Sequence, residues 1–175
     1  MTEIFEAIRD FTETGGDVLL VIGCLIFFMW LLILERIVYI NFTHKKLKND
    51  LVAKWMARNE RKSWNAEQIR QAYISRLSMQ LNGTIPIIQS LVALCPLLGL
   101  MGTVTGMIEV FDVMAISGSG NARSMASGVS KATIPTMAGM VGALSGVFAS
   151  TWLMRTSKSE KLHLQEAMPL QKDIA

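Results

Sequence analysis

Cysteine and histidine, the residues that most often bind metals or act as nucleophile and base, are scarce in this sequence. Cys24 and Cys95 each stand alone within a long apolar run, and His44 and His163 each stand alone in a charged stretch. Metal sites need several ligands at short spacing, and nucleophilic catalysis needs a base beside the nucleophile. The lysine of a phosphate-binding loop is also absent from the glycine-rich segments. We therefore expect no catalytic residue, no metal site, no cofactor and no enzymatic activity.

An excess of charge of one sign is missing as well. The 17 basic and 14 acidic residues give a net charge of +3, and no aromatic residues are interleaved with the basic ones. A nucleic-acid surface normally shows a concentrated basic patch, so this class of partner is excluded. Hydrophobic residues, in contrast, make up 51% of the 175 positions, and the mean hydropathy is +0.37. This composition is typical of a membrane protein.

Three segments have the length and the lack of charge that a bilayer span requires. The first contains 17 uncharged residues from Val18 to Leu34, and the two others lie near residues 85–108 and 132–154. At about 1.5 Å per residue, such helices cross a hydrocarbon core of about 30 Å. The acidic segment before the first run and the lack of a cleavage site favour an uncleaved anchor over a signal peptide. We predict an all-α membrane protein of one domain, residues 1–175, with spans at about 18–36, 85–108 and 132–154.

The basic residues predict the orientation of these spans. Residues 41–84 carry nine Lys and Arg, and the tail from Arg155 carries four. Because cytoplasmic segments are enriched in Lys and Arg, residues 41–84 and 155–175 are expected in the cytoplasm. The acidic N-terminus is then periplasmic and the C-terminus cytoplasmic. No glycine or proline occurs between Gly23 and Gly83, so long helices, packed as a hairpin, should project into the cytoplasm.

The second and third spans are rich in small residues, whereas the first is bulky on all sides. Helices in lipid associate by close packing, which small residues permit, so the second and third spans should form the inner layer. The pairs spaced as GxxxG are also consistent with simple packing within one subunit, which is a purely structural alternative to a functional role. The expected packing glycines are Gly99, Gly102, Gly106, Gly139, Gly142 and Gly146.

The second and third spans contain two threonines of interest, but they lack an acidic or histidine side chain that could carry a proton. Thr103 and Thr136 lie about 9 Å and about 8 Å inside the charged span ends at Glu109 and Lys131, so both hydroxyls are expected at similar depth. They could line one polar stripe, or each could bond back to its own helix. A proton path needs a titratable group, yet the spans contain no Asp, Glu or His. The chain either moves no protons or works with a partner that supplies a membrane carboxylate.

The segments LLGLMGTVTGM, 97–107, and SKATIPTMAGMVGALSG, 130–146, together resemble the paired helices of the MotA/TolQ/ExbB proton channel family, and Glu35-Arg36 at the end of the first span fits as well. The likeness is strongest to a short ExbB of a TonB system, with TolQ as the nearest rival. It implies a pentameric ring in the bacterial inner membrane around an ExbD-like dimer, whose membrane Asp carries the proton. It also implies that Thr103 and Thr136 flank the proton pathway, and that the complex drives a TonB-like protein for outer-membrane uptake of ligands such as iron-siderophores or heme.

One position departs from that resemblance. Several ExbB proteins have a Glu near the outer end of the third span, where this sequence has Lys131. Lys131 can end the helix by extending toward water, or it can act with Glu109 as a charge at the pore mouth. A different hypothesis, independent of the family resemblance, is a non-conducting scaffold that recruits partners through residues 41–84. A small-molecule transporter is disfavoured, because neither inverted repeats nor convergent polar groups are visible.

Overall fold

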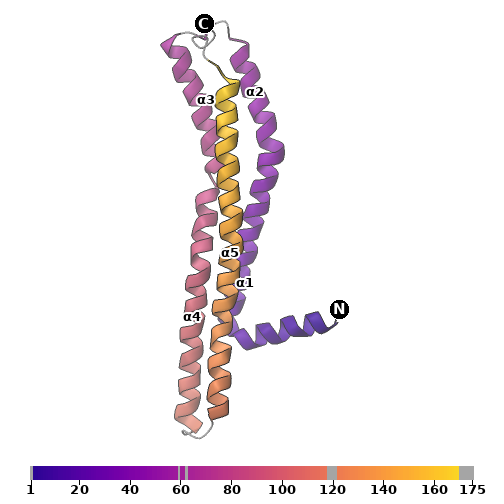
Figure 1. Cartoon of the computed structure of the whole chain (residues 1–175), viewed down its shortest axis with the longest axis vertical. Helices are drawn as coiled ribbons and strands as arrows, with labels where there is room; N and C mark the ends of the chain where they lie inside the picture. The colour runs from indigo at the N-terminus through magenta and orange to yellow at the C-terminus, as the bar shows by residue number, and fades with distance from the viewer. Residues whose placement is uncertain (1, 59, 62, 118–121, 170–175) are drawn as a thin grey trace. The chain divides into compact units, whose positions relative to one another are not determined.

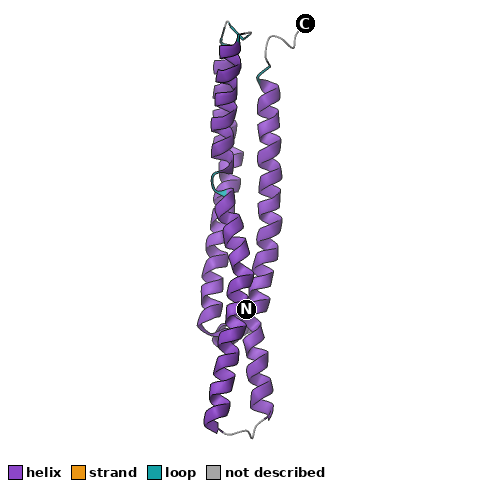
Figure 2. Cartoon of the chain, turned by 90° about the vertical axis from the view of Figure 1, so that its left-hand side faces the viewer, coloured by secondary structure: helices purple, strands orange, loops and turns teal. Residues whose placement is uncertain are grey.

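The structure is a computed structural model that describes residues 2–58, 60–61, 63–117 and 122–169 (Figure 1). Within these ranges every regular element is helical, and no strand occurs (Figure 2). The elements are α1 (Thr2–Val38), the π-helical segment η1 (Tyr39–His44), α2 (Lys45–Met56), α3 (Trp64–Asn82), α4 (Ile85–Ser117) and α5 (Ala122–Ala167).

Three helical stretches are long and apolar enough to cross a membrane, as the sequence predicts. They lie within Gly16–Met56, Trp64–Ile116 and Met125–Ala167, and each is longer than a bilayer requires. The apolar window of each is only 22%, 22% and 33% buried within the single chain. Most of each apolar surface is therefore available to lipid or to other subunits. The all-α class and the three spans are confirmed.

The chain divides into two compact units, each built from separate parts of the sequence. The first contains residues 1–30 and 89–147, and the second contains residues 31–88 and 148–175. The prediction that the whole chain is one domain is not decided by this division.

The first unit packs parts of α1, α4 and α5 together. α1 bends sharply at Gly16, where φ is 63° and ψ is −167°. This conformation is essentially restricted to glycine, because a Cβ would clash with the backbone. After the bend, α1 buries Leu19, Ile22 and Met29 inside the unit. The bulky first span thus has one face packed on protein, and its other faces expose residues such as Phe27 and Phe28.

The second unit has its own apolar core, to which α2, α3 and the end of α5 contribute. The buried members of that core are Trp55, Ala66, Ile74, Leu77, Leu164 and Met168. Arg70 on α3 donates hydrogen bonds to the carbonyls of Met168, at 2.5 Å, and of Gln165, at 2.8 Å. These carbonyls lie at the C-terminal end of α5 and lack partners within the helix, so Arg70 caps it.

The helical hairpin predicted for residues 41–84 is present. The chain leaves helical structure after Met56 and resumes at Trp64, although no glycine or proline marks the break. Beyond the hairpin, α4 continues past the predicted span end at 108 to Ser117, and α5 begins at Ala122, before the predicted span start at 132. Each helix therefore extends more than two turns past the predicted span.

Candidate functional site

The core of the first unit is a glycine-rich contact between the antiparallel helices α4 and α5. A Cβ built on Gly139 would lie 2.5 Å from the carbonyl oxygen of Cys95, and one on Gly99 would lie 3.0 Å from the Cα of Thr136. One on Gly106 would lie 2.7 Å from the Cβ of Ala132. Real Cβ atoms do not approach backbone this closely, so any side chain at these positions would push the helices apart.

The remaining three glycines bring a third helix into this contact. Gly142 faces the side chain of Ile26 on α1, with 2.5 Å from its constructed Cβ to Cδ1. Gly146 faces Met29 on α1 and Val92 on α4, at 2.6 Å and 2.5 Å. Gly102 faces Pro135 on α5. All six glycines singled out from the sequence therefore lie where helices meet, within one subunit.

Thr136 joins α5 to α4 at the centre of this contact. Its hydroxyl donates a hydrogen bond of 2.8 Å to the carbonyl oxygen of Gly99. Threonines in membrane helices commonly bond to the backbone of their own helix, and Thr136 differs because its bond crosses to another helix. The bond is possible because Gly99 has no side chain to hold the helices apart.

Thr103, in contrast, bonds to the backbone of its own helix. Its hydroxyl donates to the carbonyl of Leu100 on the same helix, at 2.7 Å. The two hydroxyls thus donate to the carbonyls of adjacent residues of α4, Gly99 for Thr136 and Leu100 for Thr103. Whether both line a proton pathway stays a prediction.

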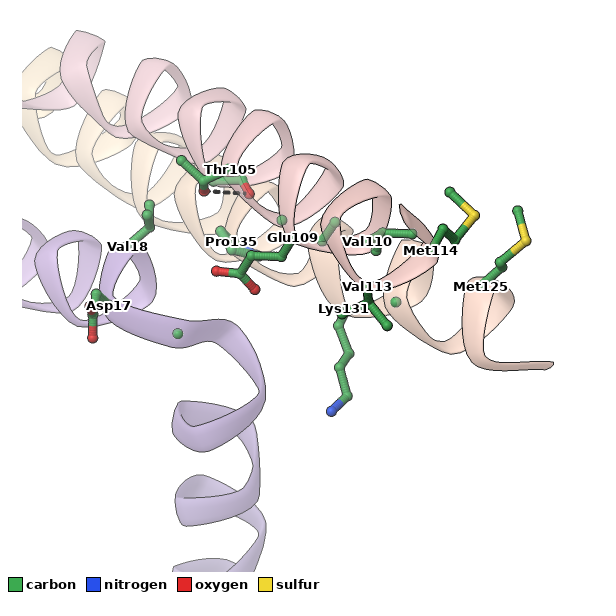
Figure 3. A pocket seen from close by; sticks show the side chains of 15 residues that line it. Asp17, Val18, Thr105, Glu109, Val110, Val113, Met114, Met125, Lys131 and Pro135 are labelled. Atoms are coloured by element: carbon green, nitrogen blue, oxygen red, sulfur yellow. Dashed lines mark hydrogen bonds between the residues drawn. The ribbon is translucent and has the colours of Figure 1, made fainter. Parts of the chain in front are cut away.

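The charged residues at one end of the three spans line a cavity of about 510 Å³ (Figure 3). Glu109 and Lys131 both line it, and so do Asp17 on α1 and Thr105 on α4. The hydroxyl of Thr105 bonds back to the carbonyl of Gly102, at 3.1 Å. Asp17 and Thr105 are not among the site residues predicted from the sequence. Thr105 could have been predicted to lie on the same helical face as Glu109, four residues later, and Asp17 follows the glycine pair at which α1 bends.

Outside the spans, the second unit holds a buried histidine next to a carboxylate. His44 is fully buried, and its Nε2 lies 3.5 Å from Oε2 of Glu160, which accepts a 3.1 Å hydrogen bond from Lys48. Burial lowers the pKa of His44, and the nearby cations Lys48 and Arg36 act in the same direction, so the opposing charge of Glu160 is outweighed. The imidazole is therefore neutral at pH 7, and the charged stretch in which His44 stands does not predict its burial.

Burial also acts on Glu160, where it favours a higher pKa. The hydrogen bond and charge of Lys48, with smaller effects from His44 and His163, outweigh it, and the pKa of Glu160 is lowered.

Among the residues that the structure describes, no three His, Cys, Asp or Glu side chains are grouped to bind a metal ion.

Comparison with known proteins identifies the chain's relatives. Residues 36–166 match the sequence profile of the MotA/TolQ/ExbB proton channel family. A putative biopolymer transport protein, ExbB-like 1, from a Synechocystis species is 46% identical over 61 residues, which are 33% of this chain and 24% of that protein. The biopolymer transport protein ExbB of Helicobacter pylori is 30% identical over 95 residues, 53% of this chain and 66% of that protein. The matched part thus spans less than two thirds of either relative.

The family match begins at Arg36, at the end of the first span, and covers the helical hairpin that follows and both glycine-rich helices. The spans and the ExbB relatives indicate a multi-pass protein of the inner membrane. This chain therefore belongs to the MotA/TolQ/ExbB proton channel family, within which it is ExbB-like.

Proposed function

We propose that this chain is the ring-forming subunit of a proton channel that uses the proton gradient, with an ExbD-like partner, to energise TonB-dependent uptake across the outer membrane. The observation that carries the proposal is the combination of a proton-channel family with uncharged runs, at residues 18–34, 85–108 and 132–154, that contain no Asp, Glu or His. A proton path through lipid needs a titratable group. A partner helix that brings one carboxylate supplies it.

The packing of the first unit suits such a partner. α4 and α5 are held together by glycine contacts and by the Thr136 hydroxyl, so their internal contact needs no large side chain. Large apolar residues on both helices, including Leu100 and Val104 on α4 and Met140 and Leu144 on α5, stay exposed in the single chain. These surfaces are available to copies of the chain, to the partner and to lipid. A pentamer is the assembly that the family suggests.

In this proposal, protonation neutralises the partner's carboxylate and lets its helix move past the apolar wall of the ring. An ionised carboxylate in the bilayer costs several kcal/mol, which neutralisation removes. Thr136 and Thr103 would offer hydroxyls along the path, and Glu109 and Lys131 would set the charge at its outer mouth. The helices beyond residue 155 and in 41–84 would hold the ring together on the cytoplasmic side.

The test uses two substitutions of Thr136 in a host that lacks its own ExbB. Thr136→Val removes the hydroxyl and keeps the shape, whereas Thr136→Ser keeps the hydroxyl. We expect Thr136→Val to abolish siderophore-dependent iron uptake while the complex still assembles, and Thr136→Ser to retain uptake. Thr156→Val is the matched control, because the Thr156 hydroxyl bonds only to its own helix, at 3.0 Å from the Trp152 carbonyl.

Two other functions predict different outcomes in the same strains. A TolQ-like subunit would restore outer-membrane integrity, measured as detergent resistance, and not iron uptake. A non-conducting scaffold would be indifferent to proton uncouplers and to changes at both threonines. Normal uptake in the Thr136→Val strain would remove Thr136 from the proton pathway.

A further inference from the structure

The cavity in the first unit has walls that combine apolar side chains with three charged ones. α1 contributes Asp17 and Val18, α4 contributes Glu109 and Val113, and α5 contributes Lys131, with other apolar and small residues between them. The bend of α1 at Gly16 forms one edge of the cavity (Figure 3). Its volume of about 510 Å³ is within the range of small-molecule sites.

The three charged residues place this cavity at the depth of lipid headgroups. Asp17 directly precedes the first apolar run, Glu109 ends the second, and Lys131 immediately precedes the third. Charged side chains at such positions mark the boundary between the hydrocarbon core and the headgroup region. The cavity therefore opens where a phospholipid headgroup meets its acyl chains, whichever way the chain is oriented in the membrane.

The charges at the cavity, those of Asp17, Glu109 and Lys131, have no ion-pair partner among the side chains that the structure describes. Figure 3 shows the side chains of Glu109 and Lys131 extending in different directions from α4 and α5. One ammonium group and two carboxylates are thus left at the rim to meet external groups of opposite charge.

We propose that this cavity binds the headgroup of a zwitterionic phospholipid that bears a primary amine, with its phosphate at Lys131 and its ammonium at Glu109 and Asp17. Ionised partners of this kind make strong, charge-assisted hydrogen bonds. The apolar residues that also line the cavity, Val18, Val113 and Met114, suit the first carbons of the acyl chains. An anionic headgroup without an amine would meet two carboxylates and one lysine, which disfavours it.

The test needs neither a proton gradient nor an ExbD-like partner, so it can fail without affecting the proposed function. The full chain is reconstituted in nanodiscs with equal amounts of phosphatidylethanolamine, phosphatidylglycerol and phosphatidylcholine. It is then released, and the lipids that stay bound are identified by native mass spectrometry. We expect phosphatidylethanolamine to be enriched about tenfold over each of the others. Phosphatidylcholine has the same charges, but its quaternary ammonium cannot donate hydrogen bonds.

Three variants connect the binding to the cavity. Asp17→Asn with Glu109→Gln should remove the preference for the amine lipid, and Lys131→Gln should lower retention of all three lipids. Val113→Trp should fill the cavity and release bound lipid without altering any charge. Glu166→Gln and Lys158→Gln, outside the cavity, should behave like the unaltered chain.

Two results overturn the proposal. One is equal retention of the three lipids by the unaltered chain, and the other is an amine-lipid preference that survives both the double substitution and Val113→Trp. Val113→Trp keeps the test decisive if the charge variants do not assemble. Soluble glycerophosphoethanolamine, which has the headgroup without acyl chains, tests whether the site also binds the chains. If millimolar amounts fail to displace the lipid, the result supports a site that also needs acyl chains. Complete displacement would contradict a site that needs them.

Discussion

The hydroxyl of Thr136 donates its hydrogen bond to the carbonyl of Gly99, 37 residues earlier in the chain and on the neighbouring helix, at 2.8 Å. The backbones also lie close together at this point, since a Cβ built on Gly99 would lie 3.0 Å from the Cα of Thr136. A polar bond and a close backbone contact thus coincide at one point of the α4–α5 contact. Any effect of substituting Thr136 on transport must therefore be separated from its effect on helix packing.

The first prediction makes that separation. Interhelical hydrogen bonds in membrane proteins contribute on average about 0.6 kcal/mol, because the unfolded chain in the membrane also finds partners. Thr136→Val should lower the free energy of unfolding by about this amount, and Thr136→Ser by less. The measurement is unfolding by SDS in mixed micelles, followed by circular dichroism. A loss above about 2 kcal/mol would mean that the bond holds the helices together, and loss of transport in Thr136→Val would then be a packing effect.

The second prediction concerns the closest backbone contact between the two helices. A Cβ on Gly139 would lie 2.5 Å from the carbonyl oxygen of Cys95 and 3.3 Å from the Cα of Gly99, both backbone atoms that cannot rotate away. Gly139→Ala should therefore force α4 and α5 apart and cost about 1 to 3 kcal/mol.

Gly23 on α1 provides the matched control for this substitution. Nothing lies within 4 Å of a Cβ built there, so Gly23→Ala should be neutral or slightly stabilising. Both variants are measured by thermal unfolding in one detergent. Equal melting temperatures for the two variants would contradict the close contact at Gly139.

The third prediction concerns the half-buried cap that Arg70 forms at the C-terminal end of α5. Arg70 is bonded to the carbonyls of Gln165 and Met168, whereas Arg76 on the same helix is exposed. Arg70→Met should leave these carbonyls without their charged donor and cost about 1 to 3 kcal/mol. Hydrogen exchange should become faster in the last two turns of α5, and Arg76→Met should leave it unchanged. Unaltered exchange in Arg70→Met would show that water replaces the cap at no cost.

The sequence was sufficient for the features that depend on local composition. Runs without charge predicted three spans, and the spacing of glycines such as Gly99 and Gly139 predicted which helices pack closely. The features that local sequence does not predict depend on tertiary contacts. The Thr136 hydroxyl bonds to a carbonyl on another helix, and the burial of His44 follows from helices that meet it from distant parts of the chain. A lone histidine among lysines has the same local sequence whether it is solvated or buried.

The buried His44 gives the fourth prediction, a dependence of stability on pH. Its pKa in the folded chain lies below the ordinary value of 6.5, because burial penalises the charged imidazole. The unfolded chain therefore binds the proton more readily than the folded chain. The contribution to stability is fully present above pH 6.5 and is lost as the pH falls from there toward the lower pKa of the folded state.

Glu160 adds a second loss of stability on acidification, at lower pH than that of His44. Its folded pKa is below 4.5, so its contribution is present above pH 4.5 and is lost as the pH falls through the folded value. Between pH 7.5 and pH 5.5 the histidine is therefore the group to test. Neither ring nitrogen of His44 has a hydrogen-bond partner in the described part of the chain, so His44→Leu should be close to neutral at pH 7.5. At pH 5.5 it should be more stable than the unaltered chain.

The measurement is the melting temperature of both proteins at several pH values, with His163→Leu as the control, because the side chain of His163 is 60% exposed. The unaltered chain and His163→Leu should lose stability in parallel as the pH falls, while His44→Leu should show a flatter profile. The neighbouring cations Lys48 and Arg36 disfavour the imidazolium, and only Glu160 favours it. If Glu160 outweighed burial, the sign would reverse, and the unaltered chain would gain stability on acidification relative to His44→Leu. Parallel profiles for all three proteins would show that His44 is equally accessible to protons in the folded and unfolded chains.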